Sequence, residues 1–352
     1  MAGSEPTSSR PFSEIIADVS HRMTGNPDTD VGILKKAMED HGQHPQAKEI
    51  LRALGRMLFD VLPPDRRKEF EQLFANDQRH WKTMISEIIA RIQEKEFDKA
   101  LDLCQELTFC NEMYADDQET TYLAFRSPLE FAFYCHKNQP KTNVRWPPFP
   151  FNDFHYYHAY TLVELKRFDE ALAVIDTGLR RNPYESRLLF ERAEIHKRCQ
   201  DMKRFLEATL ACHGACHTPA DLSHFLRNLG YYLVEQERWD EAYAAHSLSL
   251  QWENTPLAMG ELAFIVKKTG RALESFDQDL CRKKLEAMGF PLWPDKDWVL
   301  VAWSMGESFF GQKEFRHALS AFQAAYQLAR VPEIQAKIEA CEKELAALPK
   351  ES

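Results

Sequence analysis

The sequence predicts an all-α protein: a solenoid of antiparallel helix pairs that follows a small N-terminal helical module. Three observations support this prediction. A short signature recurs along the chain, apolar residues fall at helical spacing over most of it, and glycine is scarce, with 13 in 352 residues. A solenoid lengthens by stacking units, so a chain of this length does not need several separate cores.

The recurring signature is an aromatic residue followed by alanine three positions later. It begins at Phe97, Phe168, Trp239 and Phe315, and its alanines are Ala100, Ala171, Ala242 and Ala318, spaced 71, 71 and 76 residues apart. Recurrence at a nearly fixed period is the sequence sign of stacked repeats. A stack of helical repeats usually offers a surface for binding, so this pattern also bears on function.

The chain before the repeats divides into short helical segments. Residues 1–10 are polar and predict a disordered start, while residues 12–23, 31–41, 45–62 and 65–74 predict helices. Pro45 suits the first turn of its helix, where a missing N–H costs little. We expect residues 11–78 to form a helical module that is either a cap or a separate unit.

Residues 79–348 are expected to form the repeat solenoid. Apolar residues at helical spacing begin it at residues 84–92, a helix follows from Phe97, and another is predicted over residues 120–135. Helix pairs then follow at residues 155–165 with 168–181, 185–198 with 201–216, 220–235 with 239–251, 256–268 with 272–288, and 298–310 with 315–329. A polar helix at residues 332–345 would close the stack, as solenoid ends require.

A proline- and aromatic-rich segment at residues 139–152 interrupts this order. Its prolines Pro147, Pro148 and Pro150 remove backbone donors and clash with a preceding helical turn, so the segment cannot be a helix. We expect it to pack over helix ends, and a polyproline ligand for another protein is the alternative. The same packing role is expected of Trp293 and Trp298.

Small residues recur at a fixed spacing in the three best-preserved units. The pairs are Ala159 with Ala171, Gly230 with Ala242, and Gly306 with Ala318, each 12 residues apart. A small residue on each helix lets two antiparallel backbones approach closely. This pattern resembles the tetratricopeptide repeat, a helix–turn–helix unit of 34 residues. Two such units plus about three residues match the 71-residue period, and armadillo or HEAT stacks are the structural alternatives.

The resemblance covers residues 81–345, with degenerate units between the good matches. It implies a right-handed superhelix whose concave groove is lined by the first helix of each pair. The residues that it places in this groove are Tyr156, Tyr160, Glu164, Phe190, Glu194, Arg198, Arg227, Tyr231, Glu235, Trp303, Glu307 and Phe310. Aromatic residues mixed with Arg and Glu are typical of binding surfaces. The alternative is that Phe190 and Trp303 are core residues and that the charges are simply solvated.

Some family members clamp a terminal carboxylate of a peptide with Lys and Asn. Arg227 and Asn228 partly fit that pattern, whereas Tyr160 and Glu194 stand where Asn is expected. The resemblance therefore favours a non-catalytic scaffold or adaptor that binds a protein or peptide segment, but not a chaperone-tail clamp. A ligand-responsive regulator is the second hypothesis, because bacterial peptide-sensing regulators resemble this layout.

Composition excludes several other classes. The net charge of −10 comes from mixed charges without a basic block, so no nucleic acid is expected as a partner. No run of 18 apolar residues or signal peptide occurs, so no membrane association is expected. Eight scattered cysteines predict reduced thiols and a cytoplasmic location. No phosphate loop or nucleophile elbow is found, so we expect neither catalysis nor a cofactor.

A run of cysteines and histidines at residues 212–217 raises the question of a metal site. Cys212 with Cys216, or His213 with His217, would share a helical face at i, i+4. A quartet with the upstream His196 is unfavourable, because Cys212 would lie about 16 Å along the second helix. Cys212 also occupies a small-residue position of its helix, so a core role is expected and no metal is predicted.

Overall fold

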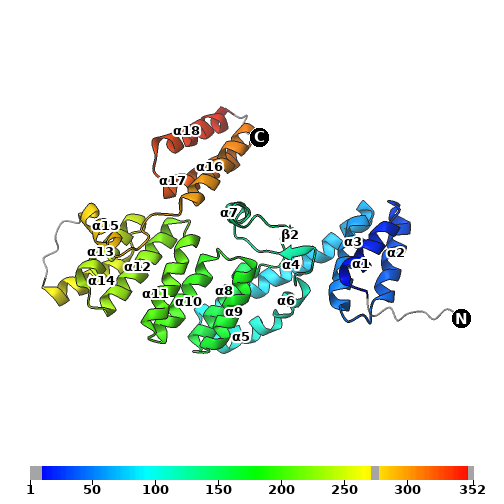
Figure 1. The fold of residues 1–352 in the computed structure, drawn as a ribbon, viewed down its shortest axis with the longest axis horizontal. Helices are drawn as coiled ribbons and strands as arrows, with labels where there is room; N and C mark the ends of the chain where they lie inside the picture. Colours follow the sequence, from blue (N-terminus) through cyan, green and yellow to red (C-terminus); the bar gives the residue numbers. More distant parts are fainter. Residues whose placement is uncertain (1–9, 271–276, 348–352) are drawn as a thin grey trace.

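The computed structural model describes residues 10–270 and 277–347, and in these ranges it is an all-α solenoid in which neighbouring helix pairs pack in series. The expected disordered start and part of the helix expected at residues 272–288 lie outside the described residues. Helices α1–α3 gather at one end, α4 leads away from them, and the following helices form a row with α16–α18 beside it (Figure 1).

The N-terminal helices α1 (Phe12–Arg22), α2 (Pro27–Asp40) and α3 (Ala47–Val61) pack around a core of their own. Its central residues include Phe12, Leu34 and Ile50, which are fully buried. The Asn26 side chain accepts hydrogen bonds from the backbone N–H groups of the first turn of α2, which satisfies donors that have no helical partner. Helix α4 (Pro64–Gln93) then runs without a break through the boundary expected at residues 78–79.

Consecutive helices with short connections form the pairs of the solenoid. The pairs are α4 with α5 (Phe97–Glu106), α8 (Phe151–Glu164) with α9 (Phe168–Arg181), α10 (Ser186–Arg198) with α11 (Met202–Cys212), and α12 (Pro219–Glu235) with α13 (Trp239–Trp252). Packing of α9 on α10 and of α11 on α12 links one pair to the next. The row therefore buries a continuous core between neighbouring units.

One backbone feature recurs in the turns within pairs. A non-glycine residue with φ between 55° and 63° stands two positions before the second helix, at Lys95, Lys166, Gln200, Glu237 and Lys313. Left-handed backbone at non-glycine residues is uncommon, so its recurrence marks equivalent turns. Gln200 belongs to a unit that lacks the sequence signature, which shows that this degenerate unit keeps the geometry of its neighbours.

The two helices of a pair approach closely at the small residues, as the sequence predicted. A Cβ added at Gly230 would lie 2.5 Å from Nε2 of His246, and one added at Gly306 would lie 2.5 Å from Cε1 of Phe322. Both rings stand one helical turn after the signature alanines, which are themselves fully buried. The prediction that small residues let these helices meet is confirmed at both positions.

The helix predicted over residues 120–135 is wrong for residues 120–127 and confirmed for residues 128–135. Residues 107–150, which we call the interrupting segment, form α6 (Phe109–Met113), β1 (Thr120–Tyr122), α7 (Pro128–Asn138) and β2 (Asn143–Arg145), with the two strands paired in parallel. The β-branched Thr120 and Thr121 favour a strand. Ser127 then caps α7 by accepting from the Glu130 N–H, and Pro128 occupies the first turn. The segment at 139–152 is non-helical through Pro150, and α8 begins at Phe151.

The C-terminal part contains α14 (Pro256–Thr269) and α15 (Gln278–Glu286), which pack on α13, and a last unit of α16 (Lys296–Gly311), α17 (Phe315–Leu328) and α18 (Pro332–Ala347). Helix α16 packs against α7, a helix of the segment that interrupts the repeats. The ring of Trp298 lies flat on Phe133 of α7 with 3.5 Å between centroids, and its Nε1 donates to the Gly214 carbonyl at 3.0 Å.

Candidate functional site

Helices α8, α10 and α12 bring most of the predicted groove residues onto one shared surface. Arg198 of α10 donates to Glu164 of α8 at 2.7 Å, and the Lys197 ammonium lies 5.3 Å from the ring centre of Tyr231 on α12. The first helices of three successive pairs are thus linked by side-chain contacts. We call this surface the central face; its predicted members are Tyr156, Tyr160, Glu164, Glu194, Arg198, Arg227, Tyr231 and Glu235.

The boundary between α8 and α10 is ordered by aromatic and charged contacts. The Arg187 guanidinium lies 4.8 Å from the ring centre of Tyr156, whose own ring is 6.4 Å from that of Tyr160. Further along, Arg198 contacts Glu164 of α8 and Glu194 of its own helix at 2.7 and 3.1 Å. These contacts hold long side chains in place before any partner binds.

Glu191 lies among these residues and was missed by the sequence prediction. Burial, followed by the neighbouring Glu194 and Glu164 carboxylates, raises its pKa to about 7, while Arg198 and Lys197 oppose that rise. Burial and the proximity of Glu191 raise the pKa of the Tyr156 hydroxyl to about 12. The sequence offered a signal, because Glu191 is seven residues before Arg198 and four after Arg187, on the same helical face.

The side of the central face formed by α12 centres on Arg227. Its Nη1 donates to Ser223 Oγ at 2.6 Å and lies 3.8 Å from the Glu253 carboxylate. Burial lowers the pKa of this guanidinium. The neighbouring His224 ring stacks on Phe190 at 4.0 Å.

Phe190 does not belong to the accessible surface. It is only 6% exposed and is part of the main hydrophobic core cluster. The core-residue alternative holds for Phe190, because its ring points toward α12 and is covered by His224.

The remaining predicted residues lie on the last unit. Trp303, Glu307 and Phe310 of α16 gather around Lys337 of α18, whose ammonium is 2.7 Å from the Glu307 carboxylate and 5.5 Å from the ring centre of Phe310. The Trp303 ring also packs on the buried Phe322. The predicted set therefore divides into two surfaces on different units.

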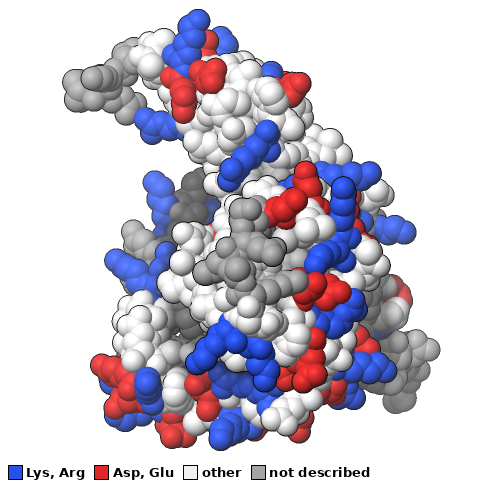
Figure 2. Space-filling view, turned by 90° about the vertical axis from the view of Figure 1, so that its left-hand side faces the viewer, with Lys and Arg blue, Asp and Glu red and all other residues white. Residues whose placement is uncertain are grey.

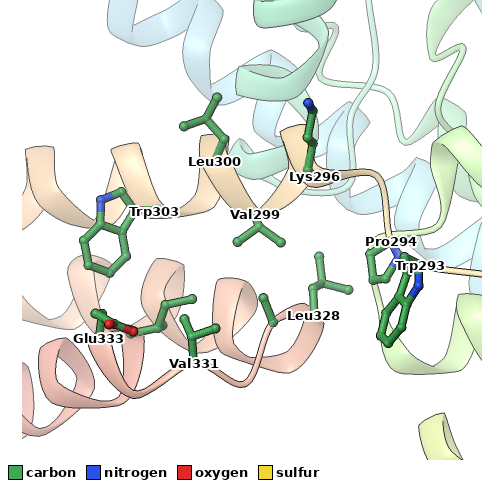
Figure 3. Close-up of a pocket in the computed structure, with 11 residues that line it drawn as sticks. Trp293, Pro294, Lys296, Val299, Leu300, Trp303, Leu328, Val331 and Glu333 are labelled. Atoms are coloured by element: carbon green, nitrogen blue, oxygen red, sulfur yellow. The ribbon is translucent and has the colours of Figure 1, made fainter. Parts of the chain in front are cut away.

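An apolar cavity of about 540 Å³ lies between α16 and the connection from α17 to α18. Val299, Leu328 and Val331 point into this space, with Trp303 at one end and Trp293 at the other (Figure 3). Trp293, Leu300 and Val331 are 54%, 50% and 41% exposed. This cavity was not predicted, because Trp293 was expected to pack as Trp298 does; of these two residues, only Trp298 is fully buried.

A smaller polar cavity of about 210 Å³ lies between α6 and α9 beside Arg180 and Arg181. Arg181 is buried, and its Nη1 donates to the carbonyls of Tyr114 and Tyr122 at 2.9 and 3.3 Å. Desolvation lowers its pKa to about 10. These contacts tie the interrupting segment to α9, so the role of Arg181 is structural.

The residues considered for a metal site have other contacts. Helix α11 ends at Cys212 and a short 3-10 turn follows, so Cys212 and Cys216 do not share a regular helical face as expected. Both are buried, and desolvation raises the pKa of each thiol. The His213 Nε2 lies 2.7 Å from the Trp293 carbonyl oxygen, and His217 stacks on Trp298. Within residues 10–270 and 277–347, no group of three or more His, Cys, Asp or Glu is placed to hold a metal ion.

Charges of both signs are interspersed on the face of the molecule seen in Figure 2. Figure 2 shows Lys and Arg beside Asp and Glu over the face that it presents. None of the helices in the described part of the chain combines the length and the apolar character needed to cross a membrane.

Comparison with known proteins finds solved structures that resemble this chain. No family model matches the sequence, and no curated protein matches it. The chain is similar to a chain in the crystal structure of the APC/C hetero-tetramer Cut9–Hcn1, with a TM-score of 0.33 and 11% sequence identity. The match covers 97% of this chain and 53% of the other, so the chain spans about half the length of that protein.

Proposed function

We propose that this protein is a non-catalytic scaffold or adaptor of the cytoplasm that binds a peptide or protein segment along the central face of its tetratricopeptide-like helix pairs. One observation carries the proposal: the first helices of three successive pairs present half-buried tyrosine and arginine side chains on one shared surface. Tyrosine and arginine supply much of the binding energy in protein interfaces.

The contacts between these side chains favour binding. Arg198 and Glu164 are joined by an ion pair, and Arg187 rests on Tyr156, so each gives up less conformational freedom when a partner arrives. Ordering a long side chain at an interface costs about 0.5–1.5 kcal/mol, and prior ordering removes part of that cost. A segment lying across α8, α10 and α12 would meet a repeated pattern of such groups.

Affinity capture from the native host tests the proposal. The wild type is compared with the triple variant Tyr160→Ala, Arg227→Ala, Tyr231→Ala, which we expect to lose its partner while keeping the helical circular dichroism spectrum. The matched control changes three exposed residues of α11 to alanine: Lys203, Arg204 and Glu207. If the triple variant captures the partner as well as the control variant does, the central face is the wrong surface.

A ligand-responsive regulator is the second candidate. The apolar cavity of about 540 Å³ in the last unit favours it, since cavities of this size accept small molecules or apolar side chains. Compaction of the protein in small-angle scattering on addition of a short peptide would favour the regulator over the scaffold.

A further inference from the structure

We propose that the central face accepts a lysine or arginine side chain of the bound segment in a niche formed by Tyr156, Tyr160 and Glu191. This inference rests on the proposed function and adds the chemistry that the segment must carry. It is argued from the pairing of charges on α8, α10 and α12, which leaves the carboxyl group of Glu191 without a cation and without a hydrogen bond.

The cations of the central face are already matched. Their carboxylate partners are Asp153 and Glu185 for Arg187, Glu194 for Lys197, Glu164 and Glu194 for Arg198, and Glu253 for Arg227. An acidic group of a partner would therefore have to compete with an existing ion pair at each of these positions.

Glu191 differs from the other carboxylates of this surface. Within the part of the chain that the structure describes, no hydrogen bond or ion pair reaches its carboxyl group, although Arg198 and Lys197 influence it from a distance. On α10 it stands four residues after Arg187, which rests on Tyr156, and seven before Arg198, which contacts Glu164, so it faces the stretch of α8 that holds both tyrosines. Burial and the Glu191 carboxyl group raise the pKa of both tyrosine hydroxyls, and Glu164 adds to the rise at Tyr160. The niche thus combines an unpaired carboxyl group with the ring of Tyr160 and with the ring of Tyr156, on which Arg187 also rests.

These neighbours select a cation over other side chains. An ammonium or guanidinium group gains a charge-assisted hydrogen bond from a carboxylate and is attracted to the face of an aromatic ring. A carboxylate would be repelled by Glu191 and by the adjacent Glu164 and Glu194. An apolar side chain would bury the carboxyl group of Glu191 further without giving it a partner, which is unfavourable.

Binding of a cation should also release a proton from Glu191. The charged and titratable groups that interact with Glu191 are Tyr156, Tyr160 and Glu164 from α8 and Glu194, Lys197 and Arg198 from α10. A bound cation stabilises the ionised carboxylate, so it lowers the pKa of Glu191 from about 7 and a proton leaves on binding. Affinity should therefore rise as the pH increases from 6 to 8.

Pools of nine-residue peptides with blocked ends test this inference. The central residue is lysine, arginine, norleucine or citrulline, and the other positions are random over uncharged residues. Fluorescence anisotropy should show that the lysine or arginine pool binds at least tenfold more tightly than its neutral counterpart, with tighter binding at pH 8 than at pH 6. The variant Glu191→Gln should lose both the preference and the pH dependence, and Glu207→Gln, at an exposed position of α11, should keep them.

The outcomes separate this inference from the proposed function. Equal binding of the charged and neutral pools, or a charge preference that remains in Glu191→Gln, would overturn the inference of a cation niche. In that case the proposed function still stands if the Tyr160, Arg227 and Tyr231 triple variant abolishes binding of every pool. If none of the pools binds the wild type, both are overturned.

Discussion

At Gly306 the partner helix lies so close that an added Cβ would be 2.5 Å from the Phe322 ring. Phe322 is fully buried, so it has little room to move away. We expect Gly306→Ala to lower the free energy of unfolding by about 1–3 kcal/mol, the usual cost of overpacking a core. Thermal unfolding followed by circular dichroism measures the change.

Gly260 of α14 is the matched control, because nothing lies within 4 Å of a Cβ added there. Alanine is a better helix former than glycine by about 1 kcal/mol, so Gly260→Ala should keep or raise the melting temperature. Equal losses in the two variants would contradict the importance of close approach at Gly306.

Three buried histidines and the half-buried His224 make stability depend on pH. Burial lowers the pKa of His155 to about 3 and of His158, His224 and His246 to about 4, from an ordinary value of 6.5. Between pH 6.5 and pH 4 these histidines bind protons in the unfolded chain but stay mostly neutral in the folded chain. The free energy of unfolding therefore decreases as the pH falls from 6.5 toward 4. Each group removes about 1.4 kcal/mol per pH unit in that window.

His246 allows a direct measurement of this effect. Both of its ring nitrogens are buried without a hydrogen bond, and its ring faces Gly230 as Phe322 faces Gly306. The variant His246→Phe should therefore keep the fold and lose less stability than the wild type in urea unfolding between pH 7 and pH 5. The same pH dependence in both proteins would contradict a neutral, unpartnered His246.

At the scale of elements, the local sequence pattern predicted the helix pairs well and the interrupting segment poorly. Apolar spacing and aromatic–alanine signatures depend on neighbours within one or two turns, so α8 to α13 could be predicted closely. The parallel pairing of β1 with β2 and the packing of α7 on α16 join residues far apart in sequence. Periodicity carries no information about such contacts.

The candidate site could also be predicted only in part from the sequence. The resemblance gave inward positions on α8, α10 and α12, and these side chains do share a surface. On α10 it predicted Phe190 as a groove residue, but Phe190 is buried in the structure. It did not predict the neighbouring Glu191. Glu194 and Arg198, predicted on the same side of α10, do lie on the surface, so Phe190 is buried because His224 of α12 covers its ring. Sequence periodicity does not show such a contact between neighbouring pairs.

Stacking of Phe133 on Trp298 should be measurable as a coupling between α7 and α16. Each single alanine variant should lower the free energy of unfolding by about 3–5 kcal/mol, because both side chains are fully buried. A double-mutant cycle should give a coupling of about 0.5–1.5 kcal/mol or more. Phe133→Ala combined with Phe12→Ala, in the separate core of α1, should be additive. Additivity in both cycles would contradict the stacking.

For the molecule as a whole, the interrupting segment links the start of the repeat row to the last unit. Its aromatic residues Tyr114, Tyr122 and Phe149 belong to the core around α4 and α5, while Lys137 of α7 pairs with Asp295 at 3.2 Å and with Asp297. The position of α16–α18 beside the row therefore depends on α7 (Figure 1).

The combined change Lys137→Glu and Trp298→Ala should release the last unit. Repulsion from Asp295 and Asp297 would replace two ion pairs, and the stacking on Phe133 would be lost. We expect a larger radius of gyration in small-angle scattering with little change in helix content. Lys141→Glu, at an exposed residue near β2, serves as the control. An unchanged radius in the double variant would show that other contacts hold the unit.

Hydrogen–deuterium exchange in the presence of a bound peptide tests the central claim most directly. A peptide selected on the wild-type protein from a display library is added, and amide protection is mapped along the chain. Protection should concentrate in α8, α10 and α12 and should vanish in the Tyr160, Arg227 and Tyr231 triple variant. Protection confined to α14, or to the apolar cavity of the last unit, would contradict binding on the central face.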